Sequence, residues 1–303
     1  MKHLFIVNPI AGGRDHTEEV RAKVEAAFAA REGEYEIYVT RAPMDATAKI
    51  KAEAATGEEL RVYACGGDGT FNECVCGAAE LENVALCPFP TGTGNDFCRM
   101  FGEESELYRE LDALLDGTTR KIDLIRVNDR WCSNIASVGI DARIGTDVHK
   151  YSHLPLIGGA AGYVVSAVVN MFKGISRNMY VKCGEYYAEG KHTLLCACNG
   201  RFYGGGFNPT MDARPDDGEL DFIIVRQVSI FTFARLIGKY AAGRADEFPK
   251  YVTHLKGTKI EIGFDDEEVI NVDGEGIFAD RVTMTLIPGA ARLIVPRGMK
   301  FFG

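Results

Sequence analysis

The sequence predicts two domains, an α/β domain followed by a β-rich domain. In the first part of the chain, short apolar runs typical of buried strands alternate with helical patterns, and three of the expected strands end in glycine-rich loops. Such alternation is typical of a parallel sheet covered by helices. From about Lys121 onward, short strands follow one another with turn residues between them. The predicted fold is therefore a three-layer α/β domain and a C-terminal β-sandwich with helical insertions.

Periodicity and turn residues place the elements of the first domain. Runs that are apolar or that alternate indicate strands, and apolar residues at helical spacing indicate helices. The expected strands cover residues 3–8, 34–40, 62–65 and 84–88, and the expected helices cover 17–30, 46–55, a segment that starts after the glycines at 66–69, and a short piece near 97–101.

The second part of the chain begins with a hairpin signal. Strands are expected at 122–127 and 131–136 around Asn128-Asp129-Arg130, because Asn and Asp favour tight turns. Further strands are expected at 194–197, 220–225, 259–264, 269–273, 281–286 and 291–295, with helical insertions at 154–172 and 230–242.

Composition excludes several classes of function. The net charge of −9 argues against general nucleic-acid binding, which needs a basic surface. The nine cysteines are scattered without a C-x-x-C pair, which disfavours a zinc site and a disulfide framework. The chain opens on the strand-like segment KHLFIVNP, which does not have the pattern of a signal peptide. A reducing, cytoplasmic location is the expectation.

One segment approaches the length of a membrane span. Residues 154–172, LPLIGGAAGYVVSAVVNMF, carry no charge, but they include a proline, three glycines and polar residues. A buried or membrane-surface helix is therefore favoured over a spanning helix.

The stretch from Gly66 to Glu73 is the strongest local signal for a ligand. The glycines allow a tight turn after an apolar strand, and Thr70-x-x-Glu73 has the form of a capping box that would start a helix. A helix N-terminus can bind phosphate, and a cation would be needed between a phosphate and Asp68, which suggests a Mg²⁺-nucleotide. The same turn occurs in α/β folds without ligands, and no Walker A pattern is present.

Two further loops strengthen this interpretation. The loop at residues 9–13 contains two glycines, and the loop at residues 90–96 is rich in Gly and Thr. Each follows an expected strand. Because the carboxyl ends of parallel strands meet at one edge of a sheet, all three loops should gather there.

Two acidic turns are candidates in the second domain. Asp273 and Glu275 lie in a glycine-flanked turn after an apolar strand, which favours a functional pair over a solvated hairpin tip. A carboxylate there could serve as a general base. The segment Asp216-Asp217-Gly218 fits a metal site and an ordinary turn equally well.

These motifs, taken in order, resemble those of the diacylglycerol kinase-like lipid kinases, a family that includes bacterial diacylglycerol kinases and eukaryotic sphingosine and ceramide kinases. The resemblance covers nearly the whole chain. The matching segments are Asn8-Pro9-x-Ala11-Gly12, Gly66-Gly67-Asp68-Gly69-Thr70 with Asn72-Glu73, Pro90-x-Gly92-Thr93-Gly94-Asn95-Asp96-Phe97, Asn134 to Asp141, Asp212 to Asp221, and Val272-Asp273-Gly274-Glu275. GGDG alone is only moderately specific, since NAD kinases and 6-phosphofructokinases share it.

The resemblance implies an ATP- and Mg²⁺-dependent kinase, with the nucleotide between a kinase domain of residues 1–122, rejoined by about 290–303, and a lipid- and metal-binding domain of residues 123–289. It implies Glu275 as catalytic base, and Asp68, Asp123 and Asp273 as a carboxylate network around the catalytic Mg²⁺. It implies a structural Mg²⁺ site of Asp217 with the carbonyls of Arg214 and Glu219, where Glu219 departs from the family's usual apolar residue. The implied nucleotide contacts are Asn8, Pro9, Ile10, Ala11, Gly12, Thr40, Gly66, Gly67, Asp68, Gly69, Thr70, Phe71, Asn72 and Thr93.

The expected acceptor is a lipid hydroxyl, foremost that of diacylglycerol, which would give phosphatidate. A soluble-metabolite kinase such as an NAD kinase and a non-catalytic nucleotide-binding protein are the alternatives. Residues 143–182 hold five Lys or Arg and one acid around the apolar 154–172 segment, so we expect peripheral contact with an anionic membrane there. A homodimer is compatible with the resemblance.

Overall fold

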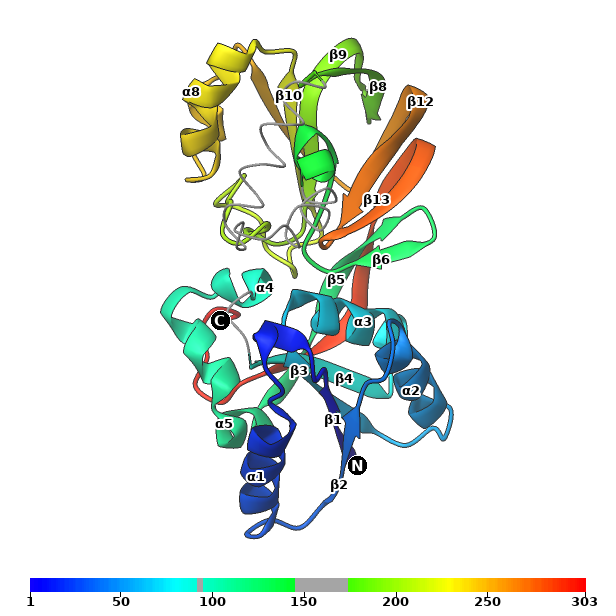
Figure 1. Ribbon diagram of the computed structural model, residues 1–303, viewed down its shortest axis with the longest axis vertical. Coiled ribbons are helices and arrows are strands. Elements are labelled where there is room, and N and C mark those ends of the chain that lie inside the picture. The colour runs from blue at the N-terminus through cyan, green and yellow to red at the C-terminus, as the bar shows by residue number, and fades with distance from the viewer. Residues whose placement is uncertain (92–94, 145–173) are drawn as a thin grey trace. The chain divides into compact units, whose positions relative to one another are not determined.

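The computed structural model describes residues 1–91, 95–144 and 174–303 of the chain. The chain folds into two compact units (Figure 1). Unit 1 comprises Met1–Leu124 and Pro288–Gly303, and unit 2 comprises Ile125–Ile287. The expected helix at residues 154–172 and the expected nucleotide contact Thr93 lie outside the described residues.

Unit 1 is built on a parallel sheet. Its strands are β1 (Lys2–Val7), β2 (Glu34–Val39), β3 (Leu60–Gly66) and β4 (Val84–Pro90), and they pair in the order β2-β1-β3-β4. The end of β13 (Glu275–Val295) adds a further parallel partner, with Arg292 opposite Ala85. Every residue of β3 and β4 is buried, as the long apolar runs of a sheet covered on both faces require.

Helices flank this sheet in two groups. Helices α2 (Asp45–Ala54) and α3 (Asp68–Ala78) pack on each other, and α1 (Thr17–Phe28) packs on α5 (Leu111–Leu115). Figure 1 shows the two pairs on opposite faces of the strands. The three-layer prediction is confirmed. The remaining helical pieces are η1 (Ala11–Gly13), α4 (Asp96–Arg99) and η2 (Gly102–Arg109).

Unit 2 is dominated by antiparallel strands. They are β5 (Thr118–Val127), β6 (Arg130–Cys132), β7 (Ile135–Gly139), β8 (Arg177–Cys183), β9 (Tyr186–Cys198), β10 (Leu220–Arg226), β11 (Val252–Gly257), β12 (Lys259–Val272) and the first part of β13. Helix α8 (Ile230–Tyr240) and the short η3 (Ala245–Glu247) lie between β10 and β11. Separate apolar clusters form around β12 and around α8, as expected of a layered β domain.

Register shows that β7 and β8 lie end to end between the same two neighbours. Ile135–Gly139 pairs with the second half of β9, and Arg177–Cys183 pairs with its first half. Both strands also pair with β12 on their other side. The chain therefore leaves the sheet after β7 and resumes the same position in it at β8.

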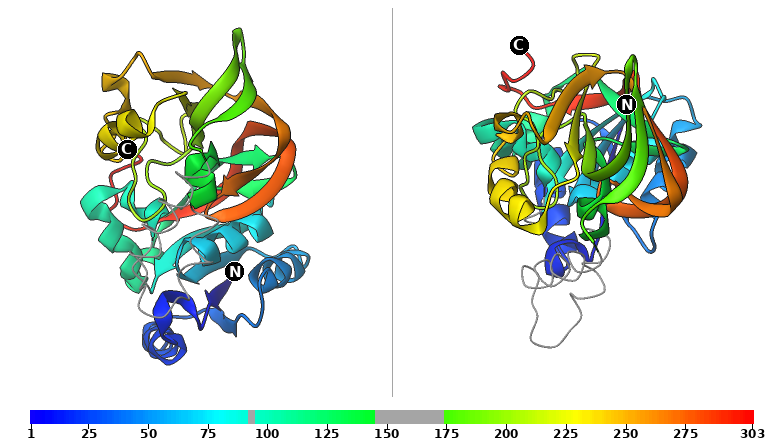
Figure 2. Two further views of the ribbon diagram at one scale, coloured as in Figure 1. Left: turned by 45° about the horizontal axis from the view of Figure 1, so that its top comes forward. Right: turned by 90° about the horizontal axis from the view of Figure 1, so that it is seen from above.

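Several expected boundaries in unit 2 are wrong. The segments expected at 259–264 and 269–273 form one strand, β12, which is interrupted by a bulge and ends at Val272, and 281–286 and 291–295 belong to one strand, β13. Both are long and strongly curved (Figure 2). The expected strand 131–136 is two short strands with a break at Ser133-Asn134. A bulge or a break removes the alternation by which strands are recognised in a sequence.

All nine cysteines are free thiols, and seven of them are buried. Burial raises the pKa of the Cys65, Cys74 and Cys98 thiols well above the usual range. These side chains act as small apolar groups in the core.

His3 is a buried histidine in the centre of unit 1. Its Nδ1 lies 2.8 Å from the Tyr63 hydroxyl, and only 6% of the residue is exposed. Burial, assisted by the charge of Arg61, lowers the His3 pKa from 6.5 to about 4. The imidazole is therefore neutral in the folded state at pH values where it is charged in the unfolded chain.

This difference predicts acid sensitivity. Well above pH 6.5 His3 is neutral in both states and contributes no pH dependence. As the pH falls from 6.5 to 4, only the unfolded chain takes up the proton, which lowers the free energy of unfolding by roughly 3 kcal/mol. Denaturant unfolding of wild type and His3→Gln at several pH values measures the effect. The variant should lose part of the slope within that window, and identical slopes would contradict this account.

Candidate functional site

Three loops meet at the carboxyl edge of the unit 1 sheet, as the sequence predicts. The amide of Asn8, after β1, donates to the Cys65 carbonyl at the end of β3 (3.2 Å). Its side-chain Nδ2 donates to the Thr70 hydroxyl in α3 (3.2 Å). The amide of Thr91, after β4, donates to the Gly66 carbonyl (3.3 Å). These bonds hold the three loops in fixed positions relative to one another.

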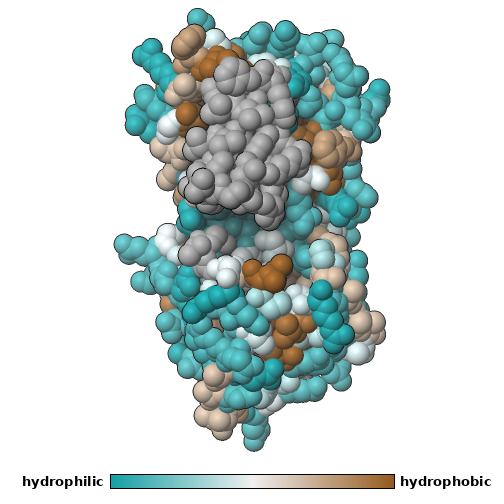
Figure 3. Space-filling view, in the orientation of Figure 1, coloured by the Kyte–Doolittle hydropathy of each residue, from teal (hydrophilic) through white to brown (hydrophobic). Residues whose placement is uncertain are grey.

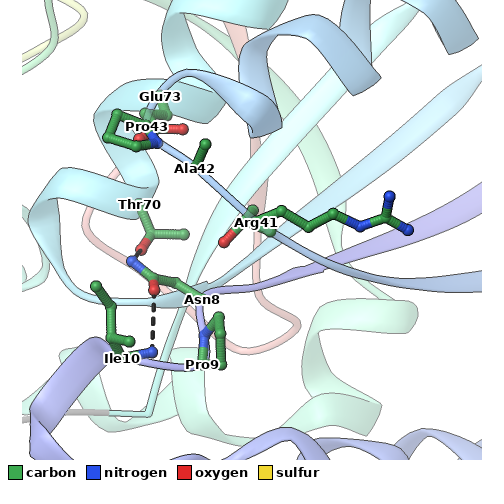
Figure 4. A pocket seen from close by; sticks show the side chains of 9 residues that line it. Asn8, Pro9, Ile10, Arg41, Ala42, Pro43, Thr70 and Glu73 are labelled. Carbon is green, nitrogen blue, oxygen red and sulfur yellow. Dashed lines mark hydrogen bonds between the residues drawn. The ribbon is translucent and has the colours of Figure 1, made fainter.

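Thr40 joins the same edge from β2. Its amide and its hydroxyl both donate to the Val7 carbonyl, at 2.9 and 3.3 Å. A pocket opens here, lined by Asn8, Pro9, Ile10, Thr40, Arg41, Ala42, Pro43, Thr70 and Glu73 (Figure 4). Five of these residues were expected as nucleotide contacts. Arg41, Ala42, Pro43 and Glu73 were missed, because no motif marks the loop after β2 and Glu73 was interpreted as part of a cap.

The expected capping box does not form. Helix α3 begins three residues earlier than that box implies, at Asp68, and its N-cap residue is Gly67 in place of Thr70, without a side-chain cap. The Thr70 hydroxyl accepts from Asn8 instead, and Glu73 lines the pocket. The first turn of α3 therefore keeps the amide groups of a helix N-terminus without a capping side chain, which is the arrangement that suits a phosphate.

Gly66 and Gly69 differ in what surrounds them. A Cβ on Gly66 would overlap the side chain of Thr70, so the protein itself excludes a larger residue there. A Cβ on Gly69 would meet no atom of the described residues within 4 Å. The main chain at position 69 is therefore open to the close approach of a ligand.

Asp68 braces the loop after β4. Its two carboxylate oxygens accept from the amides of Asp96 (2.9 Å) and Phe97 (3.3 Å), the first residues of α4. Asp96, which belongs to the third glycine-rich motif but was not expected at the site, is a second acid here and is buried, with Oδ1 3.3 Å from Nε of Arg99. The two acids lie beside the glycine loops, where a metal bound to phosphate would be needed.

Some of the expected contacts are core residues. Phe71 is buried with its ring 4.7 Å from that of Phe97, and Asn72 is buried. The Phe71 ring thus packs α3 against α4. Asp123 is also buried, and its Oδ1 accepts from the Gly289 amide (2.8 Å), which ties β5 to the turn in β13.

In unit 2, Asp273 lies in the tight turn between β12 and β13. Its φ of +48° and that of Gly274, +97°, are typical of a two-residue hairpin turn. The carboxylate accepts from the amides of Ser133, Asn134 and Ile135 at 2.6, 3.0 and 3.1 Å, and also from the Ser133 hydroxyl and the Cys132 thiol. It anchors the break between β6 and β7.

Glu275 differs from its neighbour. It begins β13 opposite Val272 and is exposed to solvent. The turn thus presents one carboxylate that is held by main-chain amides and one that is accessible.

The acidic segment between Ala213 and Leu220 forms a turn. Asp217 Oδ1 accepts from the Glu219 amide (3.1 Å), and Gly218 has a φ of +78°. Partial burial, with the negative charges of Asp221 and Glu219, raises the Asp217 pKa. A carboxyl whose ionisation its surroundings oppose would be stabilised by a cation, so the donor set fits Mg²⁺. Among the described residues no three His, Cys, Asp or Glu side chains gather closely enough to bind a metal, so an ion at this turn would need carbonyl or water ligands as well.

The motif from Asn134 to Asp141 is structural. Asn134 Nδ2 donates to the Phe202 carbonyl (2.5 Å). Gly139 has a φ of +99°, and a Cβ there would overlap the Thr193 carbonyl. Asp141 accepts from the Tyr203 hydroxyl (2.9 Å), and burial raises its pKa.

Comparison with known families supports one assignment. Residues 2–127 match the family described as the diacylglycerol kinase catalytic domain, and residues 134–295 match the YegS C-terminal NAD kinase beta sandwich-like domain. The chain belongs to the diacylglycerol kinase-like lipid kinase family. The expectation raised by the sequence motifs is thereby confirmed.

The individual relatives are distant in sequence, but their similarity extends over most of this chain. A protein of Staphylococcus aureus strain MSSA476 named "Putative lipid kinase" is 25% identical over 77% of this chain and 76% of its own length. A crystal structure titled as a "putative diacylglycerol kinase" of Bacillus anthracis str. Sterne is 27% identical, with a TM-score of 0.76 over 99% of this chain and 98% of that one. A second such structure from the same strain has a TM-score of 0.72 at 26% identity, over 98% and 99% of the two chains.

The two glycines give a paired prediction. Gly66→Ala should lower the free energy of unfolding by about 1–3 kcal/mol, because its Cβ overlaps Thr70. Gly69→Ala should not lower stability, since alanine is the better helix former and meets open space. It should weaken nucleotide binding about tenfold or more, which corresponds to one lost phosphate contact of about 1.5–3 kcal/mol. Thermal unfolding and calorimetric titration with ATP separate the effects. Unchanged ATP affinity in Gly69→Ala would contradict the ligand argument.

Removal of the Asp273 carboxylate should lower the free energy of unfolding. Asp273→Ala leaves the amides of residues 133–135 without their acceptor and should cost about 3 kcal/mol. Denaturant unfolding measures it, with exposed Asp280→Asn in the same hairpin as control. Equal midpoints for the two variants would show that the anchor is unimportant.

Proposed function

We propose that this protein phosphorylates a lipid hydroxyl, with ATP as the phosphoryl donor, Mg²⁺ as the metal and diacylglycerol as the acceptor. One observation carries the proposal. In a member of the lipid kinase family, the glycine loops are bonded to one another beside a pocket, and the position of Gly69 is open toward a ligand.

In this proposal the donor nucleotide binds in unit 1. The amide groups at the start of α3 receive the phosphates, and Asn8, Thr40 and Thr70 contribute polar groups to the pocket. Pro9, Ile10 and Pro43 give it an apolar side against which a purine can pack. The carboxylate of Glu73 at the pocket wall can accept from the exocyclic amine of adenine.

Phosphoryl transfer depends on positioning and on charge neutralisation. Magnesium supplies the neutralisation when it is bound. Asp68, with Asp96 nearby, would hold the catalytic ion, partly through water. In unit 2, Asp217 with the carbonyls of Arg214 and Glu219 would hold a structural ion. The bonds from Asp123 to Gly289 and from Asp273 to residues 133–135 suggest that these two acids position the main chain within the proposed network.

Glu275 is the proposed general base. The lipid hydroxyl oxygen attacks the γ-phosphorus, the bond from that phosphorus to the β-phosphate oxygen breaks, and the hydroxyl proton passes to the Glu275 carboxylate. The exposure of Glu275 supports this role, since a base must reach its acceptor, whereas the carboxylate of Asp273 is held by three amides.

The acceptor class is supported by the family and by the names of the relatives. A protein that takes a membrane lipid must reach the bilayer, so peripheral association is part of the proposal. No helix in the described part of the chain combines the length and the hydropathy of a membrane span.

The test is transfer of radiolabelled phosphate from ATP to a panel of diacylglycerol, sphingosine, ceramide, phosphatidylglycerol and NAD. We expect label on diacylglycerol with Mg²⁺ and none after chelation. Glu275→Gln should lower kcat by about 10²–10⁴-fold with little change in ATP affinity, because a general base acts on the transition state.

The matched control is Asp280→Asn, which removes another exposed carboxylate of β13 and should retain full activity. Label on NAD alone would overturn the lipid assignment. Full activity of Glu275→Gln would exclude it as the base.

A further inference from the structure

Helix α8 has an unusual outward face. Residues Phe233, Leu236, Ile237 and Tyr240 point inward, where they line an apolar pocket with side chains of β9 and β10. The opposite face comprises Ile230, Phe231, Ala234, Arg235 and Gly238, all of which are exposed. The solvent-facing side of an amphipathic helix is normally polar. Here Arg235 is its one charged residue, and two large apolar side chains protrude from its first turn.

The exposure of these side chains is pronounced. Phe231 is 88% exposed and Ile230 is 44% exposed. The helix that carries them is well defined, since the Ser229 side chain caps it by accepting from the Thr232 amide (3.1 Å). Figure 3 shows apolar and hydrophilic residues side by side on the surface over α8, at the upper left of the view.

The charge of this segment is opposite to that of the chain. Residues 226–244 contain Arg226, Arg235, Lys239 and Arg244 and no acid, whereas the whole chain carries a net charge of −9. Lys239 and Arg244 both pair with Glu247. Arg226 and Arg235 are exposed, and no carboxylate of the described residues lies within ion-pair distance of either. These two cations flank the protruding apolar residues.

In the basic surface expected at residues 143–182, two of the described cations are buried or paired with an acid. Arg143 is buried and donates to the Gly139 and Gly174 carbonyls, and Arg177 pairs with Glu268 at 2.7 Å. Of the five cations named there, Lys150 and Lys173 lie outside the described residues, and Lys182 is exposed. The clearer combination of exposed apolar groups and accessible cations is therefore on α8.

We propose that the N-terminal turn of α8 docks on an anionic bilayer, with Ile230 and Phe231 inserted at the level of the headgroups and Arg226 and Arg235 facing acidic lipids. Helices that bind at a membrane surface have this combination, because their apolar side chains insert at the boundary of the acyl chains and their basic side chains are attracted to the negatively charged lipids. The proposal rests on the proposed lipid substrate for its biological sense, but its physical basis is the composition of this surface.

Vesicle sedimentation without nucleotide tests the docking directly. Phosphatidylcholine vesicles with phosphatidylglycerol should bind the wild-type protein, and vesicles of phosphatidylcholine alone should bind it more weakly. Phe231→Ser should weaken binding about tenfold, as expected for the loss of one inserted aromatic ring. Arg235→Glu should weaken binding at least about fivefold on the anionic vesicles only.

Matched controls are available in unit 2. Phe278→Ser removes an aromatic side chain that is 68% exposed on β13, and Arg130→Glu reverses an exposed cation on β6. Both should bind vesicles as the wild type does. If either control loses as much binding as its partner variant, the surface on α8 is not specific and the proposal fails.

Tryptophan fluorescence can report directly whether the side chain at position 231 enters the bilayer. Trp131 is the chain's one tryptophan, so Trp131→Phe combined with Phe231→Trp puts the fluorophore on α8. Its emission should shift to the blue on anionic vesicles and be quenched by brominated lipid. Unchanged emission while the protein is bound would overturn the insertion.

Two outcomes separate this proposal from the kinase assignment. If Phe231→Ser loses vesicle binding although no lipid is phosphorylated by wild type, docking stands and the assignment fails. If wild type and Phe231→Ser bind vesicles equally and phosphorylate a dispersed short-chain diacylglycerol equally, the assignment stands and docking fails. A dimer that dissociates in Phe231→Ser with vesicle binding unchanged would identify a contact between copies and overturn the proposal.

Discussion

The parallel pairing of β1, β3 and β4 is the constraint on which the rest of unit 1 depends. Because the three strands run in the same direction in a fixed register, the chain leaves each of them at one edge of the sheet. The loops that follow are then close enough for Asn8 to reach both Cys65 and Thr70. A shift in the register of β3 would break both contacts and move Gly69 away from the pocket.

Main-chain amides hold three of the acids that the motifs single out. Asp68 accepts from the start of α4, Asp123 accepts from Gly289, and Asp273 accepts from three consecutive amides. The bonds of Asp68 and Asp273 fix the start of α4 and the break between β6 and β7, and the bond of Asp123 ties β5 to β13. Such bonds limit the motion of the loop and of the acid together, which is a requirement for a preorganised site. Glu275, exposed beside Asp273, is positioned by its neighbour's bonds rather than by its own.

The sequence is informative where a structure depends on local chemistry. The apolar run before Gly66 and the helical spacing after Thr17 are sufficient to place β3 and α1. It is less informative where partners are distant, since the residues that Asp273 binds lie about 140 positions away. Local pattern also misleads at Thr70 and Glu73, because tertiary contacts with Asn8 and the pocket replace the cap that their spacing suggests. Strands β8 and β11 were missed because their exposed and buried residues do not form a clear apolar run.

The end-to-end arrangement of β7 and β8 has a consequence for how this fold can vary. Both strands are flanked by β9 and β12, so the ladder on either side specifies where the chain must leave and where it must return. The entropy of closing a loop rises only slowly with its length, so the two ladders alone set little limit on how many residues join the strands. Homologous proteins can therefore diversify this segment while they keep the same β framework, much as antibodies vary their loops on a constant scaffold.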